Sequence, residues 1–237
     1  MAERVFVSWS GGKDSCLAAY LAIKDGMEVR HLANTVSEDG QLSRSHGLTA
    51  EVLKLQAEAI GIPLIQQKTG KNSYEADFKS LLRSLKQRDI TGGVFGDIDF
   101  IPHREWIDRV CRESGITPHY PLWGQPQDRI VNDFVELGFE AVVVATQADL
   151  LGEEWLGRKV DLDFIKDLAA LDKKITPCGE AGEYHTLVID GPLFKQRLEI
   201  VKADKVLREG HWFLEIKRSA LKPGSISAAR PLGSLTT

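Results

Sequence analysis

The chain has few cysteines and no long apolar run. Its 237 residues include three cysteines, which lie far apart and form no CxxC pair. A disulfide framework or a zinc ribbon needs paired or closely spaced cysteines, so this pattern favours a reducing compartment, and we expect a cytoplasmic protein. No apolar run reaches the roughly 18 residues of a membrane-spanning helix, so we expect no membrane partner.

The chain also lacks an excess of positive charge. It carries 30 Lys and Arg against 34 Asp and Glu, a formal net charge of −4. A protein that is held to nucleic acid by its overall field is basic, so this balance argues against a nucleic-acid partner, although a local basic patch stays compatible with it.

Strand-like and helix-like segments alternate through the first half. The buried-strand patterns lie at 4–9, 28–36, 63–67 and 92–95. The amphipathic helical patterns lie at 13–24, 48–60 and 74–88. This alternation predicts an α/β fold, with a parallel sheet that has helices on both faces and binds ligands beside its first strand.

The second half is less regular. Its helical patterns lie at 104–113, 128–137 and 162–171. Its strand patterns lie at 139–146, 183–189, 197–202 and 212–217. We therefore expect a smaller, mixed α+β part after a boundary near Asp97, which gives units at 1–97 and 98–218 and a tail at 219–237.

The strongest chemical signal is the hexapeptide SGGKDS, directly after the first strand. Gly11 and Gly12 allow a tight turn and a close approach of the backbone to an anion. The amides and the dipole of the following helix attract that anion. Ser10 and Ser15 add hydroxyl donors and Lys13 adds a charge, so the segment predicts a phosphate cradle, different from the Walker and GxGxxG patterns. The alternative is an ordinary helix start with a glycine turn and a serine cap.

A second polar cluster lies in the sequence CGEAGEYHT at 178–186. Glu183 and His185 are two residues apart, so on a strand they would face the same side, and Glu180 is near enough to join them. A carboxylate beside an imidazole can orient it, raise its basicity or hold a cation such as ammonium. The alternative is that Glu183 and His185 form a satisfied structural pair.

Two arginines are further candidates. Arg104 or Arg158 could clamp a carboxylate or the alpha phosphate through a bidentate contact, and the alternative for both is a surface ion pair. We expect Trp123 and Trp155 to be core residues. Cys178 lies near His185, but no third group supports a thiolate nucleophile there.

SGGKDS resembles the pyrophosphate-binding loop of the ATP pyrophosphatases with the Rossmann-like adenine-nucleotide alpha-hydrolase fold. The resemblance implies an ATP-binding unit at 1–97 that cleaves ATP between the alpha and beta phosphates and adenylylates a substrate oxygen. It implies that residues 10–15 hold the beta and gamma phosphates and that Asp14 helps to place Mg²⁺. It also implies that the adenosine is flanked by Ala33, Asn34 and Thr35.

Further motifs resemble the diphthine–ammonia ligase family. They are LQAEAIGIP at 55–63, GDID at 96–99, PLWG at 121–124, WLGR at 155–158 and GEAGEYHT at 179–186. The resemblance covers about residues 4–200 and implies a ligase that uses ATP and ammonium to convert a carboxylate to an amide, releasing AMP and pyrophosphate. The family's acceptor is diphthine, a modified histidine on elongation factor 2.

The resemblance also implies site residues. The unit at 98–218 would bind the acceptor. The implied acceptor-binding residues are His46, Asp97, Arg104, Arg158, Glu180, Glu183 and His185. The implied catalytic residues are Lys13, Asp14, Arg104, Glu183 and His185.

The chain departs from the family at two positions. The family reads GEGGEFET where this chain reads GEAGEYHT, so His185 replaces a glutamate. The family's YQR segment is Pro102-His103-Arg104 here. A sister branch with the GExGEYHT form is associated with cobalamin metabolism, and this chain is closer to that branch. A corrinoid or another small carboxylate is therefore an alternative acceptor.

Two other functions are open. An RNA-modifying ATP pyrophosphatase would need a basic RNA-binding surface or catalytic cysteines, and a non-catalytic nucleotide sensor would not need the second polar cluster. No Cys-His arrangement suggests a glutaminase, so free ammonium is the expected nitrogen donor.

Overall fold

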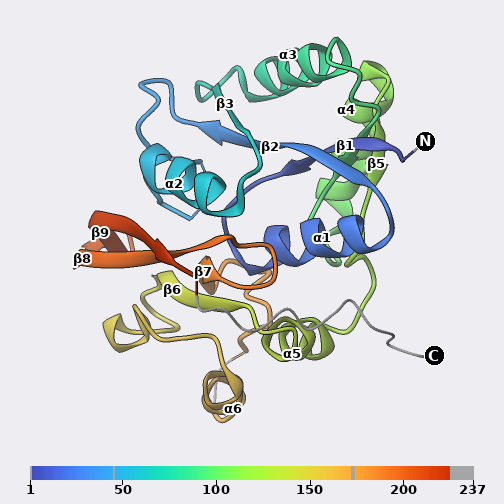
Figure 1. The fold of residues 1–237 in the computed structure, drawn as a ribbon. Coiled ribbons are helices and arrows are strands. Elements are labelled where there is room, and N and C mark those ends of the chain that lie inside the picture. Colours follow the sequence, from blue (N-terminus) through green and yellow to red (C-terminus); the bar gives the residue numbers. More distant parts are fainter. Residues whose placement is uncertain (1, 45, 172–173, 225–237) are drawn as a thin grey trace.

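The computed structural model describes residues 2–44, 46–171 and 174–224, and it contains two sheets (Figure 1). The first sheet has the strand order β3-β2-β1-β4-β5, and its pairings are all parallel. Its strands are β1 (Arg4–Ser8), β2 (Glu28–Val36), β3 (Leu64–Lys68), β4 (Gly92–Val94) and β5 (Thr117–His119). Because β1 is central, the winding direction changes beside it, where open parallel sheets bind ligands.

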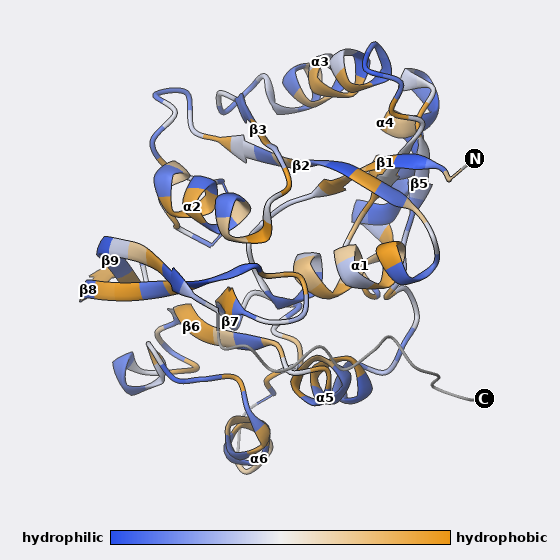
Figure 2. Ribbon diagram, in the orientation of Figure 1, coloured by the Kyte–Doolittle hydropathy of each residue, from blue (hydrophilic) through white to orange (hydrophobic). Residues whose placement is uncertain are grey.

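Helices cover both faces of this sheet, as its sequence predicted. They are α1 (Lys13–Lys24), α2 (Ala50–Ile60), α3 (Tyr74–Lys86) and α4 (Ile101–Ser114). Alternation along β1 sends Phe6 toward the core under α3 and α4, and sends Val5 and Val7 toward the core under α1. Each helix turns its apolar stripe inward, which is visible as alternating orange and blue along the helices in Figure 2.

The second sheet is antiparallel, with the order β7-β6-β9-β8. It lies on the far side of α1 and α2 from the first sheet (Figure 1). Its strands and the helices of this half are β6 (Glu140–Gln147), β7 (Tyr184–Asp190), β8 (Gln196–Arg208), β9 (His211–Pro223), α5 (Gln127–Glu136), α6 (Leu162–Ala169) and the short 3-10 helix η1 (Glu153–Trp155). Cys16 of α1 shares one buried cluster with Val143 of β6 and Phe134 of α5. The expected α/β sheet with a smaller mixed part is thus confirmed.

The limits of the two halves differ from those expected. Both α4 and β5 follow Asp97, yet β5 pairs with β4 in the first sheet, so the change of sheet comes after His119. The strand β9 runs to Pro223 because it pairs with β8 along its length, so the segment expected as a tail from 219 begins as strand. The rest of that expected tail, 225–237, lies outside the described residues.

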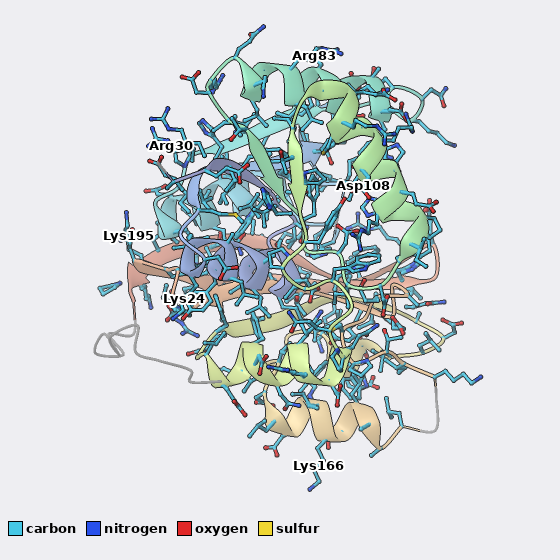
Figure 3. All side chains as sticks on the ribbon, turned by 90° about the vertical axis from the view of Figure 1, so that its right-hand side faces the viewer. Lys24, Arg30, Arg83, Asp108, Lys166 and Lys195 are labelled. Carbon is cyan, nitrogen blue, oxygen red and sulfur yellow. The ribbon has the colours of Figure 1, made fainter. Side chains whose placement is uncertain are left out.

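Several charged side chains lie at the periphery. Lys24, Arg83 and Lys166 point outward from three different helices in Figure 3. Within the described ranges, no helix is long and apolar enough to cross a membrane.

Candidate active site

The turn between β1 and α1 needs both of its glycines. Gly11 has a φ of +80°, which disfavours other residues, and a Cβ there would lie 2.8 Å from Oε1 of Gln56. Gly12 has an ordinary φ, but a Cβ there would collide with the His46 ring and lie 3.2 Å from the carbonyl oxygen of Thr186. The turn is therefore packed closely against α2 and β7.

The turn presents a set of hydrogen-bond donors. The hydroxyl oxygens of Ser10 and Ser15 lie 3.1 Å apart, and the Gly12 N–H donates to Ser10 Oγ at 3.3 Å. The Lys13 N–H donates to Thr186 Oγ1 at 3.0 Å, which ties the start of α1 to β7. The first-turn amides of a helix have no acceptor within the helix. Hydroxyls and such amides are the donors that phosphate oxygens require, so the residues present fit a bound phosphate.

Lys13 is a buried cation in this turn. Its side chain is 3% exposed, and Nζ donates to the Asp14 carboxylate oxygens at 3.0 and 2.8 Å and to the carbonyl oxygen of Cys178. Burial disfavours the charged form, but Asp14 and the other neighbours outweigh it and raise the pKa of Lys13 above its usual value. Lys13 is therefore positively charged near neutral pH.

A cavity of about 150 Å³ opens beside this turn. Its lining residues are Lys13, Asp14, His46, Cys178, Gly179, Glu180, Tyr184, His185 and Thr186. Lys13 and Asp14 of the phosphate-type turn, residues 10–15, are thus brought together with most of the second polar cluster. More than 160 residues separate Lys13 from Cys178 in the chain.

Two histidines form one wall of the cavity. The rings of His46 and His185 stack with centroids 4.6 Å apart, and His46 Nδ1 lies 3.0 Å from the Thr186 carbonyl oxygen. Burial and the neighbouring His185 hold the pKa of His46 well below its usual value. Burial and the Lys13 charge lower the pKa of His185 to about 4. Both rings are therefore neutral near pH 7, and a neutral imidazole has one ring nitrogen that can accept a hydrogen bond.

Glu180 is the carboxyl group of the cavity that titrates near neutrality. Burial, followed by the like charges of Asp14, Asp99 and Asp97, raises the pKa of Glu180 to about 7. A carboxyl group tuned in this way suits proton transfer at neutral pH.

Glu183 has a different place from the one expected. It is 2% exposed and does not line the cavity. Its Oε1 accepts from the Thr176 N–H at 2.6 Å, and its buried Oε2 has no hydrogen-bond partner in the described part of the chain. The strand β7 begins at Tyr184, so strand alternation with His185 does not extend back to Glu183. Glu183 braces the turn that carries Glu180.

The two arginines also lie outside the cavity lining. The Arg104 guanidinium is 4.4 Å from the ring centroid of Trp123 and close to Tyr120. Arg158 Nη2 lies 2.7 Å from Oδ2 of Asp167, the ion pair that was the alternative for this residue. Cation–π stacking and partial burial hold both guanidinium groups in place.

The acidic segment after β4 lies near the same turn. Gly96 packs so closely that a Cβ there would lie 3.0 Å from Ser15 N. The Asp97 carboxylate bonds to Nδ1 of His103, and the neighbouring Asp97 charge contributes to the shift of Glu180.

The end of β2 lies beside the turn, as expected for Ala33, Asn34 and Thr35. The Ala33 carbonyl oxygen accepts from the Trp9 N–H at 2.7 Å. Asn34 Nδ2 donates to the Trp9 carbonyl oxygen at 2.8 Å and to Ser43 Oγ at 2.9 Å. These bonds hold the β1 and β2 ends together, and a contact with adenosine stays a prediction.

Sequence reasoning missed Gln56. This fully buried residue of α2 accepts from Trp9 Nε1 at 2.9 Å and donates to the carbonyl oxygens of Gly11 at 2.9 Å and Val188 at 2.7 Å. One amide therefore joins β1, the phosphate-type turn and β7. The available signal was a polar residue within an otherwise apolar helix stripe.

Two known domain families match the chain. Residues 3–118 match the diphthamide synthase N-terminal domain, and residues 126–221 match the diphthamide synthase C-terminal domain. The chain belongs to the diphthamide synthase family. Lys13 and His46 come from the first of these domains, and Glu180 and His185 come from the second, so the cavity lies where the two domains meet.

Several curated relatives carry the name diphthine–ammonia ligase. The Schizosaccharomyces pombe protein is 33% identical over 223 residues, which are 84% of this chain and 36% of that protein. The Rattus norvegicus and Homo sapiens proteins are 27% and 25% identical, each over 90% of this chain and 88% of the relative. This diphthamide synthase family member thus spans about a third of the yeast relative and most of the mammalian ones. Membership in the GExGEYHT branch stays a prediction.

Proposed function

We propose that this diphthamide synthase family member is an ATP-dependent amide ligase of the diphthine–ammonia ligase type. It adenylylates a carboxylate, amidates that carboxylate with ammonia, and releases AMP and pyrophosphate. The observation that carries the proposal is that Lys13 and Asp14 of the phosphate-type turn line one cavity with Glu180 and His185. The names of the relatives support the same reaction class.

The turn binds the beta and gamma phosphates. The Ser10 and Ser15 hydroxyls and the first-turn amides of α1 other than that of Lys13, which is bonded to Thr186, donate to the phosphate oxygens. The Lys13 ammonium group supplies a positive charge. The Asp14 carboxylate supplies oxygen ligands of the kind that suits Mg²⁺. A bound Mg²⁺ would neutralise phosphate charge there.

Glu180 and His185, which also line the cavity, face the nitrogen donor in the proposed reaction. Ammonium must lose a proton before its nitrogen can attack a carbonyl carbon. The Glu180 carboxylate, which is about half deprotonated near neutral pH, accepts that proton. The neutral His185 ring adds a hydrogen-bond acceptor and no positive charge that would repel ammonium.

The acceptor is the open part of the proposal. Diphthine on elongation factor 2 is one candidate, and a corrinoid or another small carboxylate is the other, since His185 departs from the ligase pattern. An RNA-modifying enzyme with a catalytic thiolate is less well supported, because burial raises the pKa of Cys178 to about 12. A cytoplasmic location stays a prediction.

Mass spectrometry of the acceptor tests the proposal. ATP, Mg²⁺ and ¹⁵N-ammonium are incubated with the protein and with either diphthine-bearing elongation factor 2 or a corrinoid carboxylate. We expect ¹⁵N in an amide of one acceptor, and none with the Lys13→Ala variant. ATP binding without amidation of either acceptor would favour the sensor function.

A further inference from the structure

Gln127, the first residue of α5, is bonded both to the acidic segment after β4 and to Cys178, which lines the cavity. Its Oε1 accepts from the Cys178 N–H at 3.1 Å, and its Nε2 donates to Asp99 Oδ2 at 2.8 Å. Its backbone carbonyl oxygen accepts from the Cys178 thiol at 3.2 Å. A carboxamide carries a donor and an acceptor side by side, so this one side chain connects the acidic segment after β4 with the turn before β7.

The connection continues to the phosphate-type turn. The Cys178 carbonyl oxygen accepts from Lys13 Nζ, so Cys178 is bonded to Gln127 on one side and to Lys13 on the other. The Lys13 backbone N–H is bonded in turn to Thr186 Oγ1 at 3.0 Å. A displacement of Cys178 therefore moves the carbonyl oxygen that accepts from the buried Lys13 ammonium group of the phosphate-type turn.

The segment that carries Cys178 is braced internally and behaves as a unit. We call residues 176–183 the Glu180 turn. The Gly179 N–H donates to the Thr176 carbonyl oxygen at 3.0 Å, and the Tyr184 hydroxyl donates to the Pro177 carbonyl oxygen at 2.6 Å. Because these bonds hold its shape, the Glu180 turn transmits the position of Cys178 to Glu180.

We infer that Gln127 is a positioning residue that clamps the Glu180 turn against the acidic segment and couples the position of both to Lys13. Its role in amide ligation rests on the proposed function, whereas the clamp itself does not. The hydrogen bond from Lys13 Nζ to the Cys178 carbonyl oxygen links the phosphate-type turn to the Glu180 turn. When ATP holds Lys13 in place, this bond therefore also stabilises the position of the Glu180 turn, and the reverse holds as well.

The reactivity of the Cys178 thiol reports on the clamp without any assay of activity. Cys178 is 2% exposed and donates to Gln127, so a disulfide reagent such as DTNB reaches it slowly in the native protein. We expect Gln127→Ala to raise the rate of Cys178 modification about tenfold, the order expected for the loss of a hydrogen bond that holds the segment closed. Subtraction of the rate in Cys178→Ser removes the background of Cys16 and Cys111.

The matched control is Gln125→Ala. Gln125 lies two residues before Gln127 in the chain, and its Nε2 donates to the Pro121 carbonyl oxygen at 2.7 Å. We expect its Cys178 reactivity to equal that of the wild type. Equal reactivity in the wild type and in Gln127→Ala would overturn the inference. If Gln127→Ala does not fold, Gln127→Glu takes its place, because it removes the donor to Asp99. A rate of Cys178 modification above that of the wild type supports the clamp, and an unchanged rate contradicts it.

An ATP titration by calorimetry separates the clamp from the proposed function. We expect Gln127→Ala to weaken ATP binding about fivefold and ATP to slow Cys178 modification in the wild type. If the thiol becomes reactive in Gln127→Ala but the wild type does not bind ATP, the clamp stands and the proposed function fails. If the wild type binds ATP and Gln127→Ala changes neither affinity nor reactivity, the clamp fails.

Discussion

At the scale of single residues, the cavity is lined by the Lys13–Asp14 pair, by two imidazole rings and by the carboxyl group of Glu180. Lys13 is held positive by Asp14, and the His46 and His185 rings are held neutral by burial. Glu180 is the group whose charge changes near neutral pH. Such a site can bind an anion at one end and exchange a proton at the other.

Removal of the Lys13–Asp14 pair should weaken nucleotide binding. We expect Lys13→Ala or Asp14→Asn to cost about 1.5–3 kcal/mol of ATP binding free energy, the range for a hydrogen bond to a charged group. Calorimetric titration measures it, with Lys24→Ala at the exposed end of the same helix as the control. Wild-type affinity in both variants would contradict the assignment of this turn to phosphate.

Glu180 should make stability fall as the pH rises. Burial and then Asp14 raise its pKa from 4.5 to about 7, so between these values the folded state binds more protons than the unfolded state. The free energy of unfolding therefore decreases with pH across this window. We expect Glu180→Gln to stabilise the protein by on the order of 1 kcal/mol at about pH 8 and to have little effect below about pH 4.

Denaturant unfolding at several pH values measures this effect. The exposed Glu154→Gln is the control and should show no such dependence. A difference between Glu180→Gln and the wild type that stays constant with pH would show that Glu180 titrates as an ordinary surface glutamate.

At the scale of elements, the site depends on where α2 and β7 meet the turn after β1. The Val188 N–H donates to the Gly11 carbonyl oxygen at 3.0 Å, and Gln56 donates to the same oxygen. The turn is therefore shaped by contacts from both halves of the chain.

Gln56→Leu should destabilise the protein by about 2–4 kcal/mol. The substitution leaves the buried Trp9 indole N–H without its acceptor and two carbonyl oxygens without their second donor. Chemical denaturation measures the loss. Gln66→Leu, which removes a single partly buried bond to the Ala50 carbonyl oxygen, should cost about 1 kcal/mol or less, and equal losses in the two variants would argue against the special position of Gln56.

Gly12→Ala should reduce ATP affinity through its contact with His46. The added Cβ collides with the His46 ring, whereas the φ of −85° at Gly12 accepts alanine without strain. We expect about a tenfold loss of affinity, partly recovered in Gly12→Ala combined with His46→Ala, which removes the ring. Failure of the double variant to recover any affinity would assign the loss to the Thr186 carbonyl contact or to the His46 ring itself.

The elements themselves were only partly predictable. The helix at 13–24 and the strand at 28–36 lie where their patterns placed them, because each carries its own periodicity and is bounded by glycines or polar turns. The strand β5 was missed, since Thr117–His119 is three residues long, contains a proline and has no apolar run. The length of β8 and β9 comes from their pairing with each other, which a local pattern does not contain.

At the scale of the whole molecule, residues of both family domains line one cavity. The α1 helix lies between the two sheets, and its first turn contacts β7 of the second domain (Figure 1). Of the candidate residues that the sequence singled out in the second half, Glu180 and His185 line the cavity with Lys13, whereas Glu183 and Arg104 do not. The sequence could not predict that Glu183 accepts from the Thr176 N–H or that Asp167 is the partner of Arg158, because these contacts depend on the irregular turns between the paired residues, which carry no periodic pattern.

The central claim is that the chain cleaves ATP between its alpha and beta phosphates to activate a carboxylate. The most direct test is chromatography of the nucleotide after turnover with ATP, ammonium and each candidate acceptor. We expect AMP and an equal amount of pyrophosphate, formed only when the acceptor that becomes amidated is present. ADP and inorganic phosphate as the main products would contradict it.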